Sequence, residues 1–280
     1  MTVVVAFVGS DGAVMASDSE GTEADQTRRD VEKLWTSDGR MVFGYTGNSV
    51  VSQPLRLALE QALAGLGPGA RRWDVRAGLC AAARPVVQSA YDNFVPRVPP
   101  GQVPQQLAGT LVAIGRDDDG FWLLEIDQHN GGTWYTDPGF HAVGSGSVAA
   151  QMANGLLAHY QPLGRSVPHL RLIAYRAVSA CIDVLGGRYG VGGYVRMWQA
   201  SGANEFAPLN DAELDLVEHG VEQWRTIESE SLDRVVLEEA EAPGPEMPEP
   251  LPEGEVDEPA ETPAAGPTGT AATGAAVGHG

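Results

Sequence analysis

Residues 2–20, TVVVAFVGSDGAVMASDSE, read as two apolar strands joined by a tight turn. The stretches 2–9 and 13–18 are rich in Val and Ala, and Asp11-Gly12 between them is a strong signal for a short hairpin loop. The hairpin ends in Asp18-Ser19, and a Thr stands directly behind Met1 at its start. The sequence therefore predicts an antiparallel sheet that begins at a residue with a nucleophilic hydroxyl.

The rest of the chain groups strands together and pairs helices, rather than alternating single strands with single helices. Further strands are predicted at 33–37, 40–45, 109–115, 121–127, 133–136, 140–144 and 194–200. Helices are predicted at 48–66, 71–93, 147–160, 168–185 and 211–227. Residues 21–30 read as a polar connection and 95–107 as a Pro-rich one. This order excludes a doubly wound parallel sheet and favours an α+β fold, with two stacked antiparallel sheets and helices on both outer faces.

Charge and composition divide the chain near residue 235. The net charge is −19, and residues 236–280 contain ten acidic residues, eight prolines and no Lys or Arg. A segment of this composition cannot bury enough apolar surface to fold. We therefore expect a globular domain over 1–235 and an acidic disordered tail over 236–280. The tail is either a solubilising extension or an interaction segment for a basic partner or a regulator.

The composition also argues against several classes of protein. No apolar run approaches the roughly 20 residues that a membrane span needs, the first residues lack the basic start of a signal peptide, and no basic cluster suggests nucleic-acid binding. We expect a cytoplasmic protein. The six His are scattered without ligand spacing, and Cys80 and Cys181 lie in apolar helical stretches, so no metal, other cofactor or disulfide is expected.

The basic residues are 17 Arg and a single Lys, Lys33. A guanidinium cannot lose its proton near neutral pH, whereas an amine can, so a function that needs proton exchange would preserve a Lys among arginines. An N-terminal Thr likewise carries its own base, because its free α-amine has an ordinary pKa of about 8. Thr2 and Lys33 are therefore candidate catalytic residues, provided that Met1 is removed.

Several short motifs, in order along the chain, resemble those of proteasome-type N-terminal nucleophile (Ntn) hydrolases. The similarity is to 20S proteasome β subunits and their simpler bacterial ring relatives, and it covers about residues 1–200. The motifs are Thr2-Val3-Val4-Val5-Ala6, Asp18-Ser19, Val31-Glu32-Lys33-Leu34, Gly44-Tyr45-Thr46-Gly47 and a strand meander that closes with Gly144-Ser145-Gly146-Ser147. The resemblance implies the Ntn-hydrolase fold, a four-layer αββα sandwich.

The resemblance also implies a threonine-type peptidase that acts on peptides or unfolded proteins. Thr2 would be the nucleophile, and Asp18, Lys33 and Ser145 would complete the catalytic set. Ser19, Gly47 and Gly146 would line the oxyanion site or the substrate pocket, with Gly47 donating its backbone N–H. The chain would form a homo-oligomeric ring or compact assembly, with an unfoldase or regulator as a further partner.

The chain departs from the family pattern at three places, one of which is a loop between Asp18 and Lys33 that is one residue shorter. The family's Asp-x-x-Ser-Gly-Gly corresponds to residues 188–193, RYGVGG, which lack the Asp and the Ser. Asp183 would replace that Asp only if the glycine-rich loop folds back, and Glu20 stands where the family commonly has Arg. Two alternatives therefore stay open. One is a non-catalytic proteasome-like scaffold, and the other is an Ntn amide transferase or ligase that resolves the same acyl-enzyme with an amine.

Overall fold

The computed structural model describes residues 2–22, 28–67, 69–94, 109–127, 131–137, 139–157, 165–186 and 190–241. The chain divides into two units, Met1–Ser231 and Leu232–Gly280. Of the second unit, the structure describes only the helical residues 232–241. The predicted Pro-rich connection at 95–107 and the greater part of the predicted tail at 236–280 lie outside the described residues.

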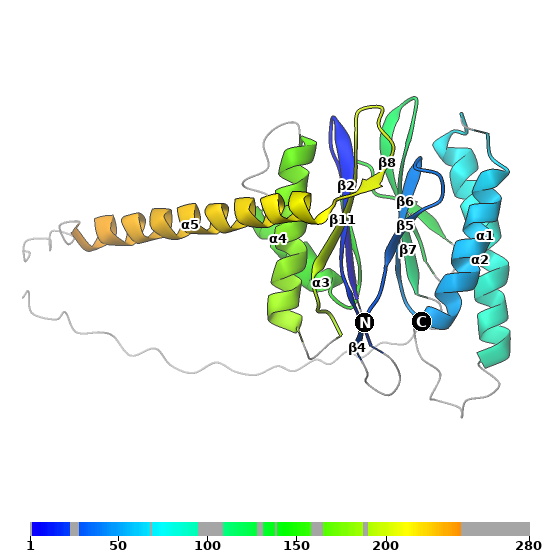
Figure 1. Ribbon diagram of the computed structural model, residues 1–280, viewed down its shortest axis with the longest axis horizontal. Coiled ribbons are helices and arrows are strands. Elements are labelled where there is room, and N and C mark those ends of the chain that lie inside the picture. Colours follow the sequence, from blue (N-terminus) through cyan, green and yellow to red (C-terminus); the bar gives the residue numbers. More distant parts are fainter. Residues whose placement is uncertain are drawn as a thin grey trace, which may run out of the picture. The chain divides into compact units, whose positions relative to one another are not determined.

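Two five-stranded antiparallel sheets form the centre of the first unit (Figure 1). The first sheet has the order β10-β1-β2-β11-β12 and consists of β1 (Val3–Val8), β2 (Gly12–Asp18), β10 (Phe140–Gly144), β11 (Val195–Ser201) and β12 (Ala207–Pro208). The second has the order β5-β6-β7-β8-β9 and consists of β5 (Leu34–Thr36), β6 (Met41–Thr46), β7 (Thr110–Asp117), β8 (Gly120–Ile126) and β9 (Gly132–Trp134). The predicted α+β class with two antiparallel sheets is confirmed.

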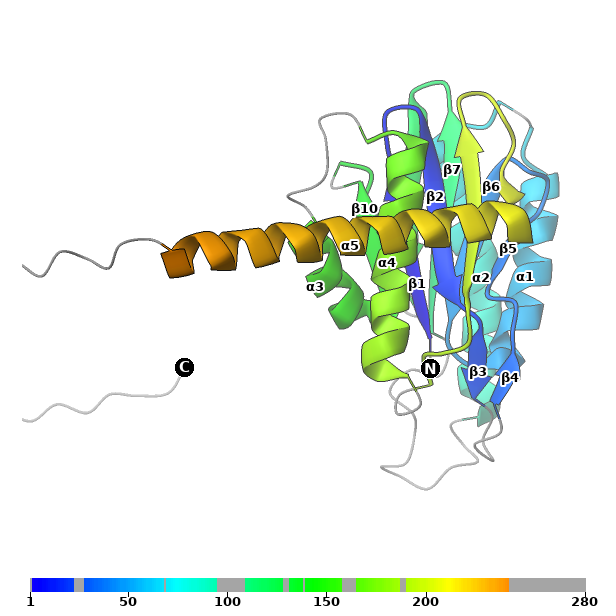
Figure 2. The same ribbon diagram turned by 60° about the vertical axis from the view of Figure 1, so that its left-hand side comes forward.

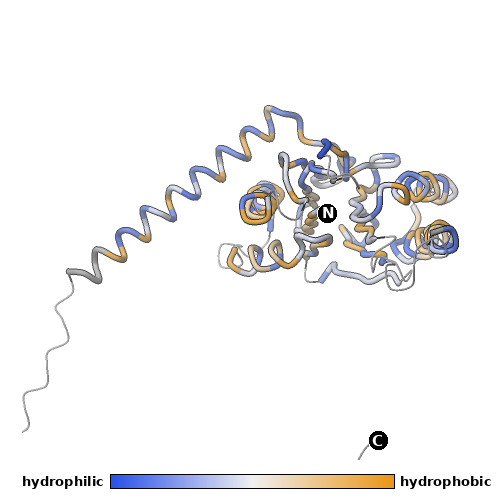
Figure 3. Tube along the Cα trace, turned by 90° about the horizontal axis from the view of Figure 1, so that it is seen from below, coloured by the Kyte–Doolittle hydropathy of each residue, from blue (hydrophilic) through white to orange (hydrophobic). Residues whose placement is uncertain are grey.

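The described part of the chain contains five helices, α1 (Ser49–Ala64), α2 (Arg72–Phe94), α3 (Ser147–Leu157), α4 (Val167–Leu185) and α5 (Asp211–Glu241). The pair α1 and α2 packs on the second sheet, and the pair α3 and α4 packs on the first. Figure 3 looks along the strands and shows their apolar residues gathered between the two pairs of helices. Both faces of each sheet therefore bury apolar side chains.

The first hairpin lies at the centre of this packing. Side chains alternate along a strand, so Val3, Val5 and Phe7 of β1 pack towards α3 and α4. Val4 and Ala6 point the other way and pack between the two sheets. A strand that is buried on both faces needs an apolar residue at every position, which explains why the sequence of β1 is a continuous apolar run.

Besides the two-residue strand β12, which was not predicted, the structure differs from the prediction at two larger places. Residues 20–30, predicted largely as a polar connection, form a second small hairpin of β3 (Glu20–Thr22) and β4 (Arg28–Asp30). Its strands are short and polar, so they lack the alternation that reveals a strand. Figure 2 shows this hairpin at the same end of the sheets as the N-terminus. Helix α5 also continues to Glu241 rather than ending near 227, because 228–241 is rich in strong helix formers.

An ion pair ties the start of α2 to the end of β7. Arg72 donates to Asp117 from its backbone N (3.2 Å), from Nε (2.8 Å) and from Nη2 (2.6 Å). Asp117 thus accepts from an otherwise unpaired N–H at the helix start and forms a bidentate pair with the guanidinium. These hydrogen bonds from Arg72 lower the pKa of Asp117 below its ordinary value.

We expect Asp117→Asn to lower the free energy of unfolding by about 1–3 kcal/mol at pH 7, because it removes a charged acceptor from a largely buried pair. A carboxylate with a lowered pKa in the folded state stabilises the fold above its unfolded pKa of about 4, and this stabilisation is lost as the pH falls through the folded value. Urea unfolding at pH 7 and below pH 3 measures the difference, which should shrink at the lower pH. Asp118→Asn, at the exposed neighbouring position, is the control. An equal cost at both pH values would contradict the expectation.

Candidate active site

The strand ends bring the predicted catalytic residues to one end of the sandwich. Thr2 directly precedes β1, which lies between β10 and β2 in the first sheet. Val3 pairs with Gly144 at the end of β10, and Val4 pairs with Ser17 near the end of β2. The antiparallel register therefore sets Thr2 between the residues that follow β10 and those that end β2, namely Ser145 and Asp18.

Asp18 is the centre of the site, and its side chain is fully buried. Its Oδ1 accepts hydrogen bonds from Thr2 Oγ1 (3.0 Å), from the Val3 backbone N (2.9 Å) and from Lys33 Nζ (2.6 Å). Its Oδ2 accepts from the Gly192 backbone N (3.0 Å). A carboxylate is an acceptor with several lone pairs, so Asp18 can bind all four donors at once. It connects the candidate nucleophile directly to the lone lysine.

Lys33 is 5% exposed and lies just before β5. Besides the bond to Asp18, its Nζ donates to the backbone carbonyl of Glu20 (2.6 Å). Burial lowers the pKa of Lys33 below its ordinary value, and the charge and hydrogen bond of Asp18 oppose this effect. The ammonium therefore gives up its proton more readily than a free lysine would.

The loop after β10 fixes the backbone of Thr2. Thr2 N donates to Ser145 Oγ (3.1 Å), and the Thr2 carbonyl accepts from Ser145 Oγ (3.3 Å) and from Gly146 N (3.2 Å). Gly144 has a φ of +94°, and a Cβ at this position would lie 2.3 Å from the Thr2 carbonyl oxygen. Only glycine permits this close approach. The Gly-Ser-Gly sequence thus holds Thr2 in place, and the N–H of Gly146 is already used in doing so.

The other two predicted lining residues, Ser19 and Gly47, directly follow β2 and β6. Ser19 is 1% exposed, and its Oγ accepts from the backbone N of Tyr194 (3.1 Å). In the structure it therefore anchors the segment before β11. Gly47 is exposed, follows β6 and packs against Gly109. Its role as an oxyanion donor stays a prediction.

The structure also shows what stands in place of the missing family motif. Asp183 is 67% exposed and lies 3.6 Å from Arg225, so it pairs away from the cluster around Asp18. Arg188 and Tyr189 lie outside the described residues. The main-chain N–H of Gly192 supports Asp18 instead. Sequence reasoning found the Gly-Gly pair but missed this role, because a backbone donor has no side chain to mark it.

A scan against models of protein families and a search of curated proteins each found no match to this chain. Within the described ranges, no group of three or more His, Cys, Asp or Glu residues is arranged to bind a metal. Of the helices seen in the structure, none is both long enough and apolar enough to cross a bilayer. The site is therefore interpreted from its own geometry.

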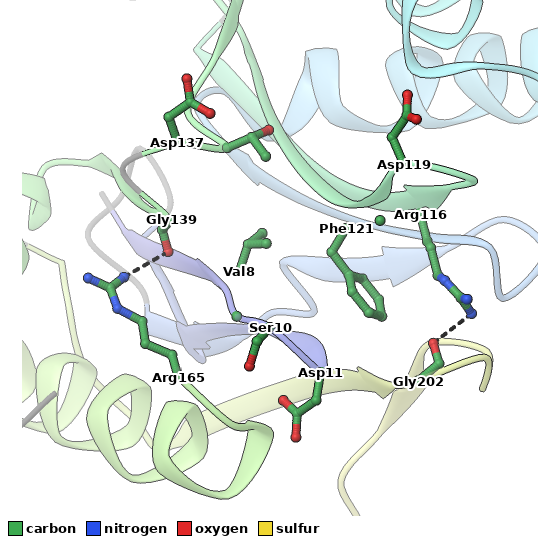
Figure 4. Close-up of a pocket in the computed structure, with 13 residues that line it drawn as sticks. Val8, Ser10, Asp11, Arg116, Asp119, Phe121, Asp137, Gly139, Arg165 and Gly202 are labelled. Carbon is green, nitrogen blue, oxygen red and sulfur yellow. Dashed lines mark hydrogen bonds between the residues drawn. The ribbon is translucent and has the colours of Figure 1, made fainter. Parts of the chain in front are cut away.

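A cavity of about 630 Å³ lies at the far end of the sandwich, around the turn after β1 (Figure 4). Val8 lines it, and the six residue steps of strand between Thr2 and Val8 span about 20 Å. Arg165 and Arg116 at its rim donate to the carbonyls of Gly139 (3.3 Å) and Gly202 (2.6 Å). This cavity is separate from the cluster around Thr2, and its two guanidinium groups are bound to the rim itself.

Proposed function

We propose that this protein is a threonine-type peptidase with the four-layer αββα fold of the Ntn hydrolases, in which Thr2 becomes the N-terminal nucleophile once Met1 is removed. One observation carries the proposal. The same oxygen of Asp18 accepts from the hydroxyl of Thr2 and from the ammonium of Lys33, while Ser145 accepts from the Thr2 nitrogen. An N-terminal nucleophile needs a hydroxyl, the α-amine of the same residue and groups that hold them in place, here the buried pair of Lys33 and Asp18.

The first half of the reaction forms an ester on Thr2. Oγ1 attacks the carbonyl carbon of the scissile peptide, and the α-amine takes the hydroxyl proton as the C–O bond forms. The electron pair of the carbonyl moves to its oxygen, where backbone donors stabilise the charge; Gly47 is the proposed donor. The C–N bond then breaks, and the proton on the α-amine passes to the leaving amine. Before the attack, Asp18 orients Oγ1 by accepting a hydrogen bond from its hydroxyl.

The second half releases the acyl product. The α-amine takes a proton from a water molecule, whose oxygen attacks the ester carbon. Collapse of this second tetrahedral intermediate breaks the bond to Oγ1, and the proton returns to that oxygen. The products are a carboxylic acid, which loses its proton to solvent at neutral pH, and the regenerated Thr2. An amine acceptor in place of water would give a new amide, which is the transferase alternative.

The proposed assembly with other copies finds support on α3. This helix contains no charged residue, and it exposes Val148, Met152 and Leu156 to 66%, 69% and 74%. These positions are four residues apart and lie along one face. Contiguous apolar faces of this kind, exposed on a folded protein, occur at protein–protein contact surfaces.

The test is the intact mass of the purified protein before and after incubation with an epoxyketone or a β-lactone. We expect loss of the Met1 mass and one adduct per chain, because an epoxyketone needs both the free amine and the hydroxyl of Thr2. Native mass measurement of the same preparation reports the assembly. Retained Met1 with no adduct would overturn the peptidase and leave the scaffold. An adduct with products extended by an added amine would favour the transferase.

A further inference from the structure

Glu20 lies against the site although it is not one of the predicted catalytic residues. It is the first residue of β3, its backbone N donates to the Gly192 carbonyl (3.0 Å), and its own carbonyl accepts from Lys33 Nζ (2.6 Å). A Cβ on Gly192 would lie 2.5 Å from Glu20 Oε2. The carboxylate therefore lies over the glycine whose N–H binds Asp18. The backbone of Glu20 is hydrogen-bonded both to that glycine and to Lys33.

Carboxylates from three strands favour the protonated form of Lys33. Asp18 ends β2, Glu20 begins β3 and Asp30 ends β4, and each favours the charged ammonium against the effect of burial. Their charges are not equally compensated. Asp18 is shared among four donors, as described above. Asp30 is 51% exposed and accepts from Tyr194 Oη (2.8 Å) and Arg196 Nη2 (2.6 Å).

The Glu20 carboxylate is the least compensated of the three. Its side chain is 11% exposed, and its one ion pair among the described residues is a long hydrogen bond that Oε2 accepts from Nη1 of the half-exposed Arg28 (3.4 Å). Its Oε1 has no exposed surface and no hydrogen-bond partner among the residues that the structure describes. A poorly compensated charge in a place with little water acts over a longer range than a screened one. Lys33 is bound to the main-chain carbonyl of the same residue, and the charge of Glu20 favours its ammonium form.

We propose that Glu20 is a positioning residue whose carboxylate holds Lys33 as an ammonium against Asp18, so that the Thr2 α-amine rather than Lys33 accepts the hydroxyl proton. This inference deepens the proposed function and rests on it for the catalytic consequence. The effect of Glu20 on the titration of Lys33 is a property of the folded chain, so it can be measured without any enzymatic activity.

Because the chain has a single Lys, protein grown with lysine labelled with ¹³C at Cε gives one side-chain resonance. Its chemical shift against pH gives the titration midpoint of Lys33 directly. We expect Glu20→Gln to lower this midpoint by roughly one pH unit, the size of effect that one weakly screened carboxylate has on a neighbouring charge. Glu20→Asp, which keeps the charge, should stay closer to the natural protein.

Glu32→Gln is the matched control, because it makes the same chemical change next to Lys33 in the sequence. Glu32 is 55% exposed and lies 3.8 Å from Arg56, so the midpoint should not move. If Glu20→Gln does not fold, Glu20→Ala takes its place with the same expectation. A midpoint in the charge-removing variant equal to that of the Glu32→Gln control would overturn the inference, even in an active enzyme. A lowered midpoint in a protein that never reacts with the epoxyketone would leave the inference standing and overturn the peptidase.

Discussion

Replacing Thr2 with Ala is expected to abolish the epoxyketone adduct and to reduce peptide hydrolysis on the order of 10³-fold or more, because the proposed nucleophile is gone. The loss should appear in kcat rather than in KM. The fold should tolerate the change. Asp18 loses one hydrogen bond of about 1 kcal/mol and keeps its bonds to the Val3 and Gly192 nitrogens and to Lys33.

Thr2→Ser is the control for this loss, because it keeps the hydroxyl and the amine and removes only a methyl group. It should still form the adduct and retain measurable hydrolysis. Thermal unfolding of both variants separates a chemical effect from a structural one. Hydrolysis by Thr2→Ala at the rate of the natural protein would show that the activity does not depend on Thr2.

The second large effect is a loss of stability when the buried pair of Asp18 and Lys33 is broken. We expect Lys33→Met and Asp18→Asn each to lower the free energy of unfolding by about 3–5 kcal/mol, because each removes the directly bonded counter-ion of a buried charge. The variant with both changes should lose much less than the sum of the two. Urea unfolding of the four proteins closes the double-mutant cycle.

The exposed pair of Arg56 and Glu60 on α1 is the matched comparison. Its two side chains are 45% and 35% exposed, and Nε lies 2.9 Å from Oε1. An exposed pair with this spacing should couple by only about 0.3–0.5 kcal/mol. Equal coupling energies for the buried and the exposed pair would contradict the view that Asp18 and Lys33 form one electrostatic unit.

The fold was predictable to the extent that burial leaves a pattern in the sequence. The continuous apolar run of β1 and the Asp-Gly turn after it identify the first hairpin, and the helices that cover the sheets follow from their apolar spacing. The β3–β4 hairpin was not predictable, because its six strand residues are polar and β4 is exposed along its length. Its position depends on tertiary contacts, such as the bond from the Glu20 nitrogen to the Gly192 carbonyl (3.0 Å).

The side-chain members of the site were predictable, whereas the main-chain members were not. Thr2 and Lys33 stand out by position and by rarity, and the resemblance brings in Asp18 and Ser145. The structure places these four in one hydrogen-bonded cluster. The donor from Gly192 has no signature in the sequence, because every residue except proline carries the same N–H. The carbonyl of Glu20 was hidden for a similar reason.

The burial of Lys33 limits which covalent modifications the folded protein can undergo. Attachment of a modifier protein through an isopeptide bond requires an accessible lysine amine, and the chain has one lysine, which is 5% exposed and bound to two oxygens. The folded protein therefore offers no lysine to such conjugation. Conjugation at Lys33 would require a chain that has already unfolded.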